Sequence, residues 1–238
     1  MDTDTSTTTA SAPTSPAAPP LIRGANLCRS FEMGSATVEV LHDVSLEVLA
    51  GEKVFLCGAS GAGKTTLMYT LAGLERPLSG EVFFDGESIY RAPKNRQAAI
   101  RNARMGYIFQ NYFLMPELTA LENVLLPAFM VAGDKRDRGA EILGRLGLSE
   151  RLDHRPSELS GGEQQRVAIA RSLINDPDVI FADEPTGNLD SKTGAGVMDA
   201  LIELVAEKKK SLIVVTHDTK LARLGDRTLE LADGRLIH

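Results

Sequence analysis

A glycine-rich segment with the residue types of a phosphate-binding loop begins at Gly58. An apolar stretch that predicts a strand, Lys53–Gly58, precedes it, and a helical pattern, Lys64–Leu74, follows it. Glycines allow backbone N–H groups to close around phosphate oxygens without clashes from Cβ atoms. At this spacing, Lys64 is expected to reach the β- and γ-phosphates of a nucleotide. The Thr65 hydroxyl is expected to hold Mg²⁺. The predicted nucleotide-contacting set is Gly58, Ala59, Ser60, Gly61, Ala62, Gly63, Lys64, Thr65 and Thr66.

Two acidic residues follow a second apolar stretch. Val179–Ala182 has the composition of a buried strand, and Asp183 and Glu184 come directly after it. Parallel α/β sheets bind ligands beyond the carboxyl ends of their strands, so both acids are expected to face the phosphates. We expect Asp183 to hold Mg²⁺ and Glu184 to act as the general base for the attacking water. A solvated acidic turn is the alternative that this pattern alone leaves open.

Two further polar residues are expected at the same edge of the sheet. His217 follows the predicted strand Leu212–Thr216, where it can contact the γ-phosphate and position either the water or Glu184. Gln110 ends the predicted strand Met105–Gln110 and is a candidate contact for Mg²⁺ and water. Taken singly, a loop histidine and a surface glutamine are the plain alternatives, and only their place beside the phosphate loop favours the catalytic interpretation.

A second segment, Leu159–Arg166, has the sequence LSGGEQQR and offers a hydroxyl and two glycines before the predicted helix Glu163–Asn175. Unpaired N–H groups and the positive end of the helix dipole make a helix N-terminus an anion site. As an isolated pattern, it fits a capped helix start equally well. The candidate anion contacts are Ser160, Gly161, Gly162 and Glu163.

The elements that must position these residues alternate along the chain. Apolar runs predict further strands at Val38–Val48, Glu81–Asp85 and Ser88–Tyr90, with a turn at Asp85-Gly86. Helical patterns cover Asp134–Gly147 and Ser191–Lys209, and Thr119 with Glu122 forms a capping box. Alternating strands and helices predict an α/β fold with a mainly parallel sheet. A helical lobe at about residues 111–160 is expected to be inserted between its strands.

The composition is that of a soluble protein. The chain has 238 residues, 43% hydrophobic and 24% charged, and its net charge of −6 disfavours a nucleic-acid surface. Residues 1–20 are rich in Thr, Ser, Ala and Pro and lack the charge and apolar core of a secretory signal, so they predict a disordered tail before a domain at 21–238. No apolar run reaches the roughly 18–20 residues of a membrane span. Cys28 and Cys57 are expected to be buried, reduced thiols.

Together, these motifs resemble the nucleotide-binding subunits of ABC transporters. The resemblance starts near Leu21 and rests on GASGAGKT, LSGGEQQR, the FADEP strand, Asn188-Leu189-Asp190 and Thr216-His217-Asp218. It implies a P-loop fold of the ABC type, with an antiparallel β subdomain and a helical lobe. It also implies an ATPase that uses ATP and Mg²⁺ and pairs head to tail with a second copy.

The resemblance implies a role for both phosphate sites. The signature of one copy, Ser160 to Glu163, would contact the ATP held by the P-loop of the other copy, and Asp190 would lie in the loop that crosses to that copy. Phe31 falls where the family places an adenine-stacking aromatic, usually Tyr, and a core position is its alternative. Thr65-Thr66 replaces the commoner Ser-Thr and keeps the hydroxyl.

Asn111–Pro127 and His154–Gly162 resemble the subgroup that includes the lipoprotein-releasing system ATPases (LolD type), macrolide-export ATPases and FtsE-type cell-division ATPases. Asn26-Leu27-Cys28 and HRPSELSGGE favour the lipoprotein-releasing type. The implied partner is an integral-membrane permease, which places the chain peripherally on the cytoplasmic face of the inner membrane. Groove candidates for that partner, with lobe core as the alternative, are Phe113, Leu114, Met115 and Leu118.

Two other function classes are alternatives to transport. An ATP-dependent signalling module of a cell-division complex predicts the same active site, so only the membrane partner separates it from a transporter. Soluble ABC ATPases of DNA repair or translation carry coiled coils, zinc insertions or two cassettes, which this sequence lacks. Because the sequence stops at His238, just after the expected last strand, no C-terminal regulatory domain is expected.

Overall fold

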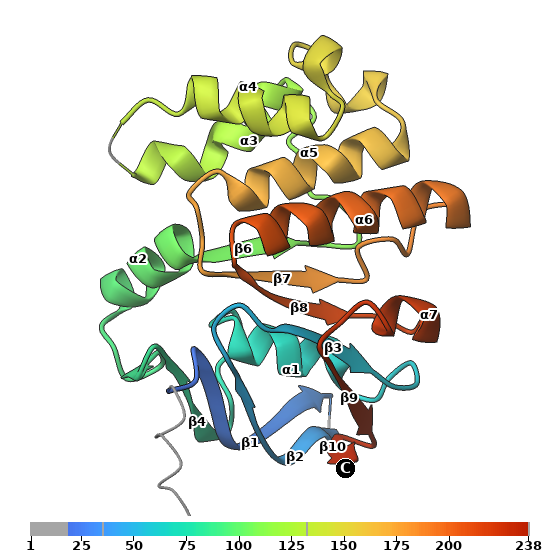
Figure 1. The fold of residues 1–238 in the computed structure, drawn as a ribbon. Helices are drawn as coiled ribbons and strands as arrows, with labels where there is room; N and C mark the ends of the chain where they lie inside the picture. Colours follow the sequence, from blue (N-terminus) through green and yellow to red (C-terminus); the bar gives the residue numbers. More distant parts are fainter. Residues whose placement is uncertain (1–18, 35, 132, 238) are drawn as a thin grey trace, which may run out of the picture.

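The computed structural model describes residues 19–34, 36–131 and 133–237 (Figure 1). The described strands form two sheets, of four strands in the order β2-β1-β4-β5 and of six in the order β10-β9-β3-β8-β7-β6. The smaller sheet is antiparallel and consists of β1 (Ile22–Met33), β2 (Ala36–Val48), β4 (Ser79–Phe84) and β5 (Glu87–Ser88). The larger sheet is parallel except for the β9–β10 pair. Its strands are β3 (Lys53–Cys57), β6 (Met105–Ile108), β7 (Val179–Asp183), β8 (Ser211–Val215), β9 (Arg227–Ala232) and β10 (Arg235–Ile237).

Helices cover the larger sheet on both faces. The α-helices are α1 (Lys64–Leu71), α2 (Lys94–Arg104), α3 (Ala120–Leu125), α4 (Arg136–Arg145), α5 (Gly161–Leu173), α6 (Ser191–Glu207) and α7 (Thr219–Ala222). Three 3-10 helices are η1 (Leu126–Met130), η2 (Ser149–Arg151) and η3 (Pro156–Glu158). Figure 1 shows α1 between the two sheets, α5 and α6 on the opposite face of the larger sheet, and α3 and α4 beyond α5. This mixed α/β arrangement, with helices between β6 and β7, confirms the predicted fold class.

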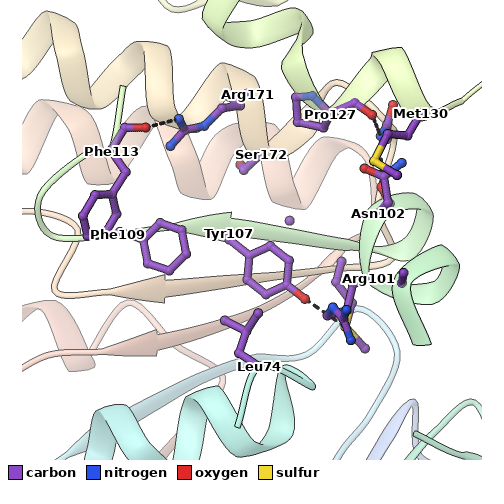
Figure 2. A pocket seen from close by; sticks show the side chains of 14 residues that line it. Leu74, Arg101, Asn102, Tyr107, Phe109, Phe113, Pro127, Met130, Arg171 and Ser172 are labelled. Carbon is purple, nitrogen blue, oxygen red and sulfur yellow. Dashed lines mark hydrogen bonds between the residues drawn. The ribbon is translucent and has the colours of Figure 1, made fainter. Parts of the chain in front are cut away.

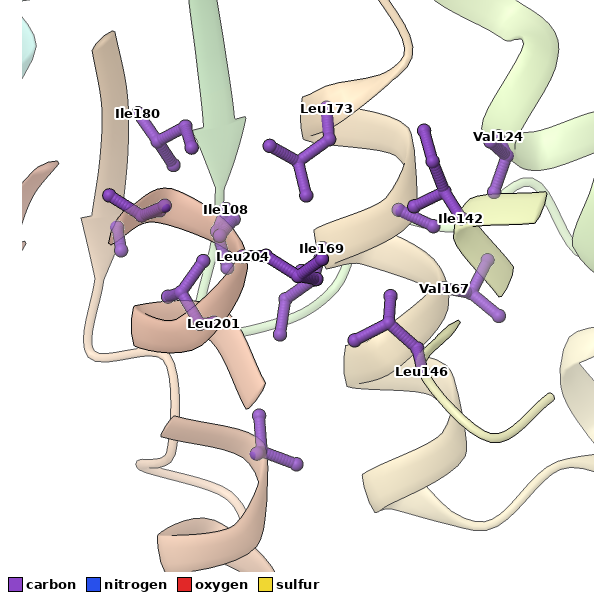
Figure 3. Packing of buried hydrophobic residues seen from close by; sticks show 14 of the residues in the cluster. Ile108, Val124, Ile142, Leu146, Val167, Ile169, Leu173, Ile180, Leu201 and Leu204 are labelled. Carbon is purple, nitrogen blue, oxygen red and sulfur yellow. The ribbon is translucent and has the colours of Figure 1, made fainter. Parts of the chain in front are cut away.

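Strict alternation along the central strands creates two hydrophobic cores. In β3, Val54 and Leu56 belong to the core shared with α1 and the smaller sheet, whereas Phe55 belongs to the core shared with α3 to α6. In β7, Phe181 faces the first core and Ile180 faces the second. Successive side chains of a strand point to opposite faces, so an apolar strand that is covered on both faces contributes side chains to both cores. The second core fixes the helices beyond α5 on the sheet (Figure 3).

Several predicted elements end earlier than expected. Helix α1 stops at Leu71, because Gly73 adopts φ +70° and the chain turns there. Strand β6 stops at Ile108, so Gln110 lies in a turn and not at the end of a strand. The predicted strand Ser88–Tyr90 is the shorter β5. The turn at Asp85-Gly86 and the capping box of Thr119 and Glu122 are confirmed.

Several elements were not predicted with bounds: β1, α2, α7, β9 and β10. Strand β1 carries register shifts against both neighbours, which interrupt its alternation. Helix α2 buries only Ile100, which is its one large apolar residue. Regularly spaced apolar residues are the main sequence signal of secondary structure, and this signal is interrupted in β1 and weak in α2.

The remaining sequence predictions concern the two cysteines, the N-terminal tail with the domain boundaries, and membrane spans. Cys28 and Cys57 are free thiols but only half-buried, so the prediction that both are buried is wrong. Burial nevertheless raises the pKa of the Cys57 thiol. The predicted tail at 1–20 lies outside the described residues except for its last two, and the boundaries at 21 and at 111–160 stay predictions. Among the residues that the structure describes, no helix is long and apolar enough to cross a membrane.

Gly106 in β6 allows α5 to approach the sheet closely. A Cβ atom there would lie 2.4 Å from the Ser172 carbonyl oxygen. This oxygen belongs to the backbone of α5, which cannot move aside as easily as a flexible side chain. We expect Gly106→Ala to lower the free energy of unfolding by about 2–3 kcal/mol, measured by urea denaturation. Gly196 in α6 is the matched control, because its Cβ would meet nothing within 4 Å. Gly196→Ala is expected to raise that free energy by about 0.5–1 kcal/mol, and a similar change in both variants would contradict the close approach.

Candidate active site

The loop between β3 and α1 can form only with glycine at two positions. Gly58 has φ +144°, and a Cβ there would lie 2.1 Å from the Leu231 carbonyl oxygen. Gly63 has φ +96°, and its Cβ would lie 2.8 Å from the Val40 carbonyl oxygen. Left-handed backbone and these close approaches exclude other residues. The loop is therefore held between β2 and β9.

The loop encloses a cavity of about 220 Å³ at the start of α1. The cavity is lined by Val40, Ser60, Gly61, Gly63, Lys64, Thr65, Thr66 and Glu184. Lys64 is 6% exposed, and its Nζ donates a 2.8 Å hydrogen bond to the Ala59 carbonyl oxygen. Of the predicted loop residues, Gly58, Ala59 and Ala62 do not line this cavity and instead shape the loop. A buried ammonium at a helix N-terminus makes the cavity strongly attractive to phosphate.

Asp183 lies at the carboxyl end of β7, directly beside the phosphate loop. The Thr65 hydroxyl donates a 3.0 Å hydrogen bond to its Oδ1. Burial raises the pKa of the Asp183 carboxyl, and hydrogen bonds from Thr65 and Tyr69 oppose that rise. Burial and the neighbouring Asp183 likewise raise the pKa of Tyr69. A hydroxyl and a carboxylate oxygen side by side form the hard oxygen set that Mg²⁺ prefers.

The next three predicted residues converge at one point. Glu184 adopts φ +42°, and its Oε1 lies 3.2 Å from the Nδ1 atom of His217. A Cβ placed on Gly187 would lie 2.8 Å from Gln110 Nε2 and 3.2 Å from Glu184 Oε2, so the two side chains approach the same glycine. Asn188 ties Gln110 to this loop, because its Nδ2 donates a 2.8 Å hydrogen bond to the Gln110 carbonyl oxygen. The carboxylate thus has an imidazole and a carboxamide as neighbours.

The LSGGEQQR segment begins α5 with a reciprocal cap. The Ser160 Oγ accepts a 3.3 Å hydrogen bond from Glu163 N, and Glu163 Oε2 accepts a 2.8 Å hydrogen bond from Ser160 N. Gly162 packs against α6, since a Cβ there would lie 2.5 Å from Thr193 Cγ2. Among the described residues, none of 160–163 lines the P-loop cavity. Within the described part of one copy, the P-loop cavity and the capped start of α5 therefore do not share lining residues.

The cap makes the stability of the protein depend on the charge of Glu163. Hydrogen bonds from Ser160, then the ion pair with Arg151, lower the pKa of Glu163 from 4.5 to about 2. A depressed carboxyl pKa stabilises the folded state above the unfolded pKa, and this contribution is lost as pH falls from about 4.5 toward 2. We expect Glu163→Gln, which keeps a capping side chain, to lower the unfolding free energy at pH 6, to differ less from wild type at pH 3, and to match wild type only as pH approaches about 2. A difference that does not change with pH in urea titrations would contradict this.

Asp190 and Phe31 lie apart from the P-loop cavity. Asp190 caps α6, where it accepts 3.1 Å hydrogen bonds from Lys192 N and Thr193 N. Hydrogen bonds from Thr193 lower its pKa. It also lines a cavity of about 470 Å³ together with Glu184 and His217. Phe31 is half-buried and belongs to neither core.

Two residues beside the site, Tyr69 and Val40, are not singled out by the sequence, and Asn188 appears there only as part of a motif and without a role. Tyr69 lies beside Asp183 and lowers the pKa of its carboxyl, Val40 lines the P-loop cavity, and Asn188 holds the Gln110 segment. Tyr69 lies one turn after Thr65 on α1, so helical spacing alone was a usable signal. Val40 lies in β2, and only the packing of the two sheets brings it to the loop.

Comparisons with known proteins match this geometry. A model of the ABC transporter family matches residues 41–187. The lipoprotein-releasing system ATP-binding protein LolD of Syntrophotalea carbinolica is 48% identical, covering 91% of this chain and 96% of its own. LolD of Shewanella oneidensis is 47% identical, covering 87% of this chain and 92% of its own.

Solved structures of the ATP-binding cassette MJ0796 have the same fold. A dimeric structure in a post-hydrolysis state, bound to ADP and phosphate, has a TM-score of 0.84 and 39% identity, covering 91% of this chain and 97% of its own. A second dimeric structure of that bacterial ABC transporter cassette has a TM-score of 0.85 and 41% identity, with the same coverage. With these matches spanning the P-loop, the acidic strand and the capped glycine segment, the chain is an ATPase cassette and belongs to the ABC transporter family.

Proposed function

We propose that this chain is the ATPase subunit of a lipoprotein-releasing system, working as a head-to-tail dimer on a membrane permease. The observation that carries the dimer is the separation of the P-loop cavity from residues 160–163 within one copy. A site that one copy leaves incomplete requires a second copy. Identity of 47–48% to two LolD proteins over at least 87% of the chain supports lipoprotein release as the work performed.

Nucleotide binding relies on the P-loop and α1. Backbone amides of the loop and the Lys64 ammonium hold the β- and γ-phosphates, and Phe31 offers a face for adenine. Arg29 lies over that ring at 4.4 Å, which leaves its other face for stacking. Thr65, Asp183 and Gln110 would hold Mg²⁺ through their oxygens, and the ion would supply charge that offsets the phosphates.

Hydrolysis uses the residues gathered at the end of β7. Glu184 accepts a proton from the attacking water, and His217, 3.2 Å away, orients that carboxylate and contacts the γ-phosphate. Gln110 positions the same water. In the dimer, Ser160, Gly161, Gly162 and Glu163 of the second copy close on the γ-phosphate with the N-terminus of α5, and Asp190 lies at the crossing loop. ATP then holds the dimer together and its hydrolysis releases it.

An apolar groove of about 510 Å³ is the proposed binding site for the membrane partner (Figure 2). Its lining includes Leu74, Tyr107, Phe109, Phe113 and Met130, and Met130 and Phe113 are 77% and 61% exposed. A large exposed apolar patch marks an interaction site. We assign the groove to an apolar segment of the permease, which holds the chain at the cytoplasmic face of the inner membrane.

Only part of the predicted groove set lines this cavity. Phe113 does, whereas Leu114 packs against the buried core and so follows the alternative interpretation. Met115, which is 48% exposed, and Leu118, which is half-buried, lie outside the lining.

The test is reconstitution with the membrane subunits that co-purify with the full chain. We expect Mg-ATP to release an acylated protein from proteoliposomes, and we expect Glu184→Gln to prevent release while the complex stays intact. Replacing the acylated protein with its unacylated form is the matched control. Export of a macrolide without release of the acylated protein would overturn the proposal in favour of the exporter subgroup. ATP-dependent dimerisation without movement of either cargo would favour the signalling function.

A further inference from the structure

The segment after Gln110 contains a strained turn. Tyr112 and Phe113 are consecutive non-glycine residues with φ of +59° and +47°. This left-handed conformation is unfavourable for residues with a Cβ, and two in succession persist only when surrounding contacts hold them. The turn is also tight, because Phe113 N donates a 2.5 Å hydrogen bond to the Asn111 carbonyl oxygen.

One side chain from α5 holds this turn. The two terminal nitrogens of Arg171 donate hydrogen bonds, one at 2.6 Å to the Phe113 carbonyl oxygen (Figure 2) and one at 2.5 Å to the Tyr112 carbonyl oxygen. Among the described residues, Arg171 forms no ion pair with a carboxylate, and burial lowers the pKa of its guanidinium. Arg171 is half-buried, and a cation that is partly removed from water needs hydrogen-bond acceptors for its donors. The guanidinium and the turn therefore stabilise one another.

The same segment contacts three functional parts of the molecule. At its start, the Gln110 carbonyl oxygen accepts the hydrogen bond from Asn188, in the loop that follows Glu184. In its middle, the Tyr112 hydroxyl lies 3.2 Å from the position of a Cβ on Gly161, at the start of α5. At its end, the Phe113 ring lines the apolar groove (Figure 2). A change in the turn would move all three contacts.

We propose that Arg171 is a positioning residue that holds Gln110 beside Glu184 through the Tyr112–Phe113 turn. Since the turn also carries a groove residue, Arg171 links the occupancy of the groove to the placement of the Gln110 carboxamide. The assignment of the groove rests on the proposed function, whereas the effect on Gln110 does not. Arg171 does not line the P-loop cavity, so its removal is expected to act on the catalytic step and to spare nucleotide binding.

The first test compares Arg171→Gln with Arg138→Gln in the full chain. Arg138 is a matched control, because it also donates a hydrogen bond to a backbone carbonyl, that of Leu173, and lies outside the site. We expect Arg171→Gln to lower kcat by about 10-fold and to change KM for ATP by less than about 2-fold, because misplacement of a positioning group costs rate. Hydrogen exchange at the amides of residues 110–114 should speed up. Arg138→Gln should leave kcat, KM for ATP and the exchange rate at residues 110–114 unchanged.

A glycine rescue separates positioning from general stability. Glycine adopts positive φ without strain, so Phe113→Gly added to Arg171→Gln should recover part of the lost kcat and of the amide protection. The cycle is completed with the single Phe113→Gly variant, and Arg171→Lys, which keeps charge and one donor, should lie between wild type and Arg171→Gln. Unchanged exchange at 110–114 in Arg171→Gln would overturn the proposal, as would equal losses in kcat and nucleotide affinity or no rescue by glycine. None of these readouts uses permease or lipoprotein, so their failure is distinct from failure of the proposed function.

Discussion

Glu184→Gln is expected to lower the rate of ATP hydrolysis by about 10²–10⁴-fold while ATP still binds, because the amide cannot accept a proton from water. The side chain lines the P-loop cavity and lies 3.2 Å from His217, and glutamine has nearly the same shape. Unhydrolysed ATP should then hold two copies together. Light scattering with and without Mg-ATP measures the shift from monomer to dimer, and phosphate release measures the rate.

The same background tests the role of Ser160. Ser160→Asp keeps an N-cap for α5 but places a negative charge where the γ-phosphate of the other copy is expected. We expect the double variant Glu184→Gln, Ser160→Asp to bind ATP and remain monomeric. Glu207→Gln, at an exposed carboxylate paired with Arg145, is the control and should hydrolyse ATP normally. If Glu184→Gln retains more than a tenth of the rate, or if the double variant still dimerises, the assigned roles are wrong.

Lys64→Met is expected to weaken ATP binding by about 100-fold, which corresponds to about 2.7 kcal/mol. Lys64 is 6% exposed, and its hydrogen bond is to the Ala59 carbonyl oxygen, so its charge is available to phosphate. Methionine keeps much of the side-chain volume and removes the ammonium. Nucleotide affinity by calorimetry is the measurement.

The matched control is Lys53→Met, which removes an ammonium paired with Asp226 at 2.9 Å and remote from the nucleotide. It should leave ATP affinity unchanged. Because Lys64→Met removes a buried charge without a carboxylate partner, the free energy of unfolding should stay equal or rise. A large loss of stability with unchanged nucleotide affinity would show that Lys64 serves the fold and not the phosphate.

Much of the site was predictable because its chemistry is local in sequence. The glycines of the P-loop, the caps at Ser160 and Thr119, and the period-2 strands depend on residues within a few positions of one another. Such short-range rules also placed Asp183 and Glu184 at the end of a buried strand. They failed for α2, whose sequence buries only Ile100, and for β1, whose bulges interrupt alternation.

The sequence by itself was enough to locate the phosphate loop, the acidic strand end and the signature. Glycine turns, helix caps and apolar strands each depend on residues within a few positions of one another, so short sequence patterns reveal them. Only the tertiary structure decided that Phe113 lines the groove while Leu114 joins the core. It alone brought Arg171 to a turn 58 residues earlier in the chain. These contacts depend on how closely α5 approaches β6, a distance set by Gly106 and by packing between residues far apart in sequence.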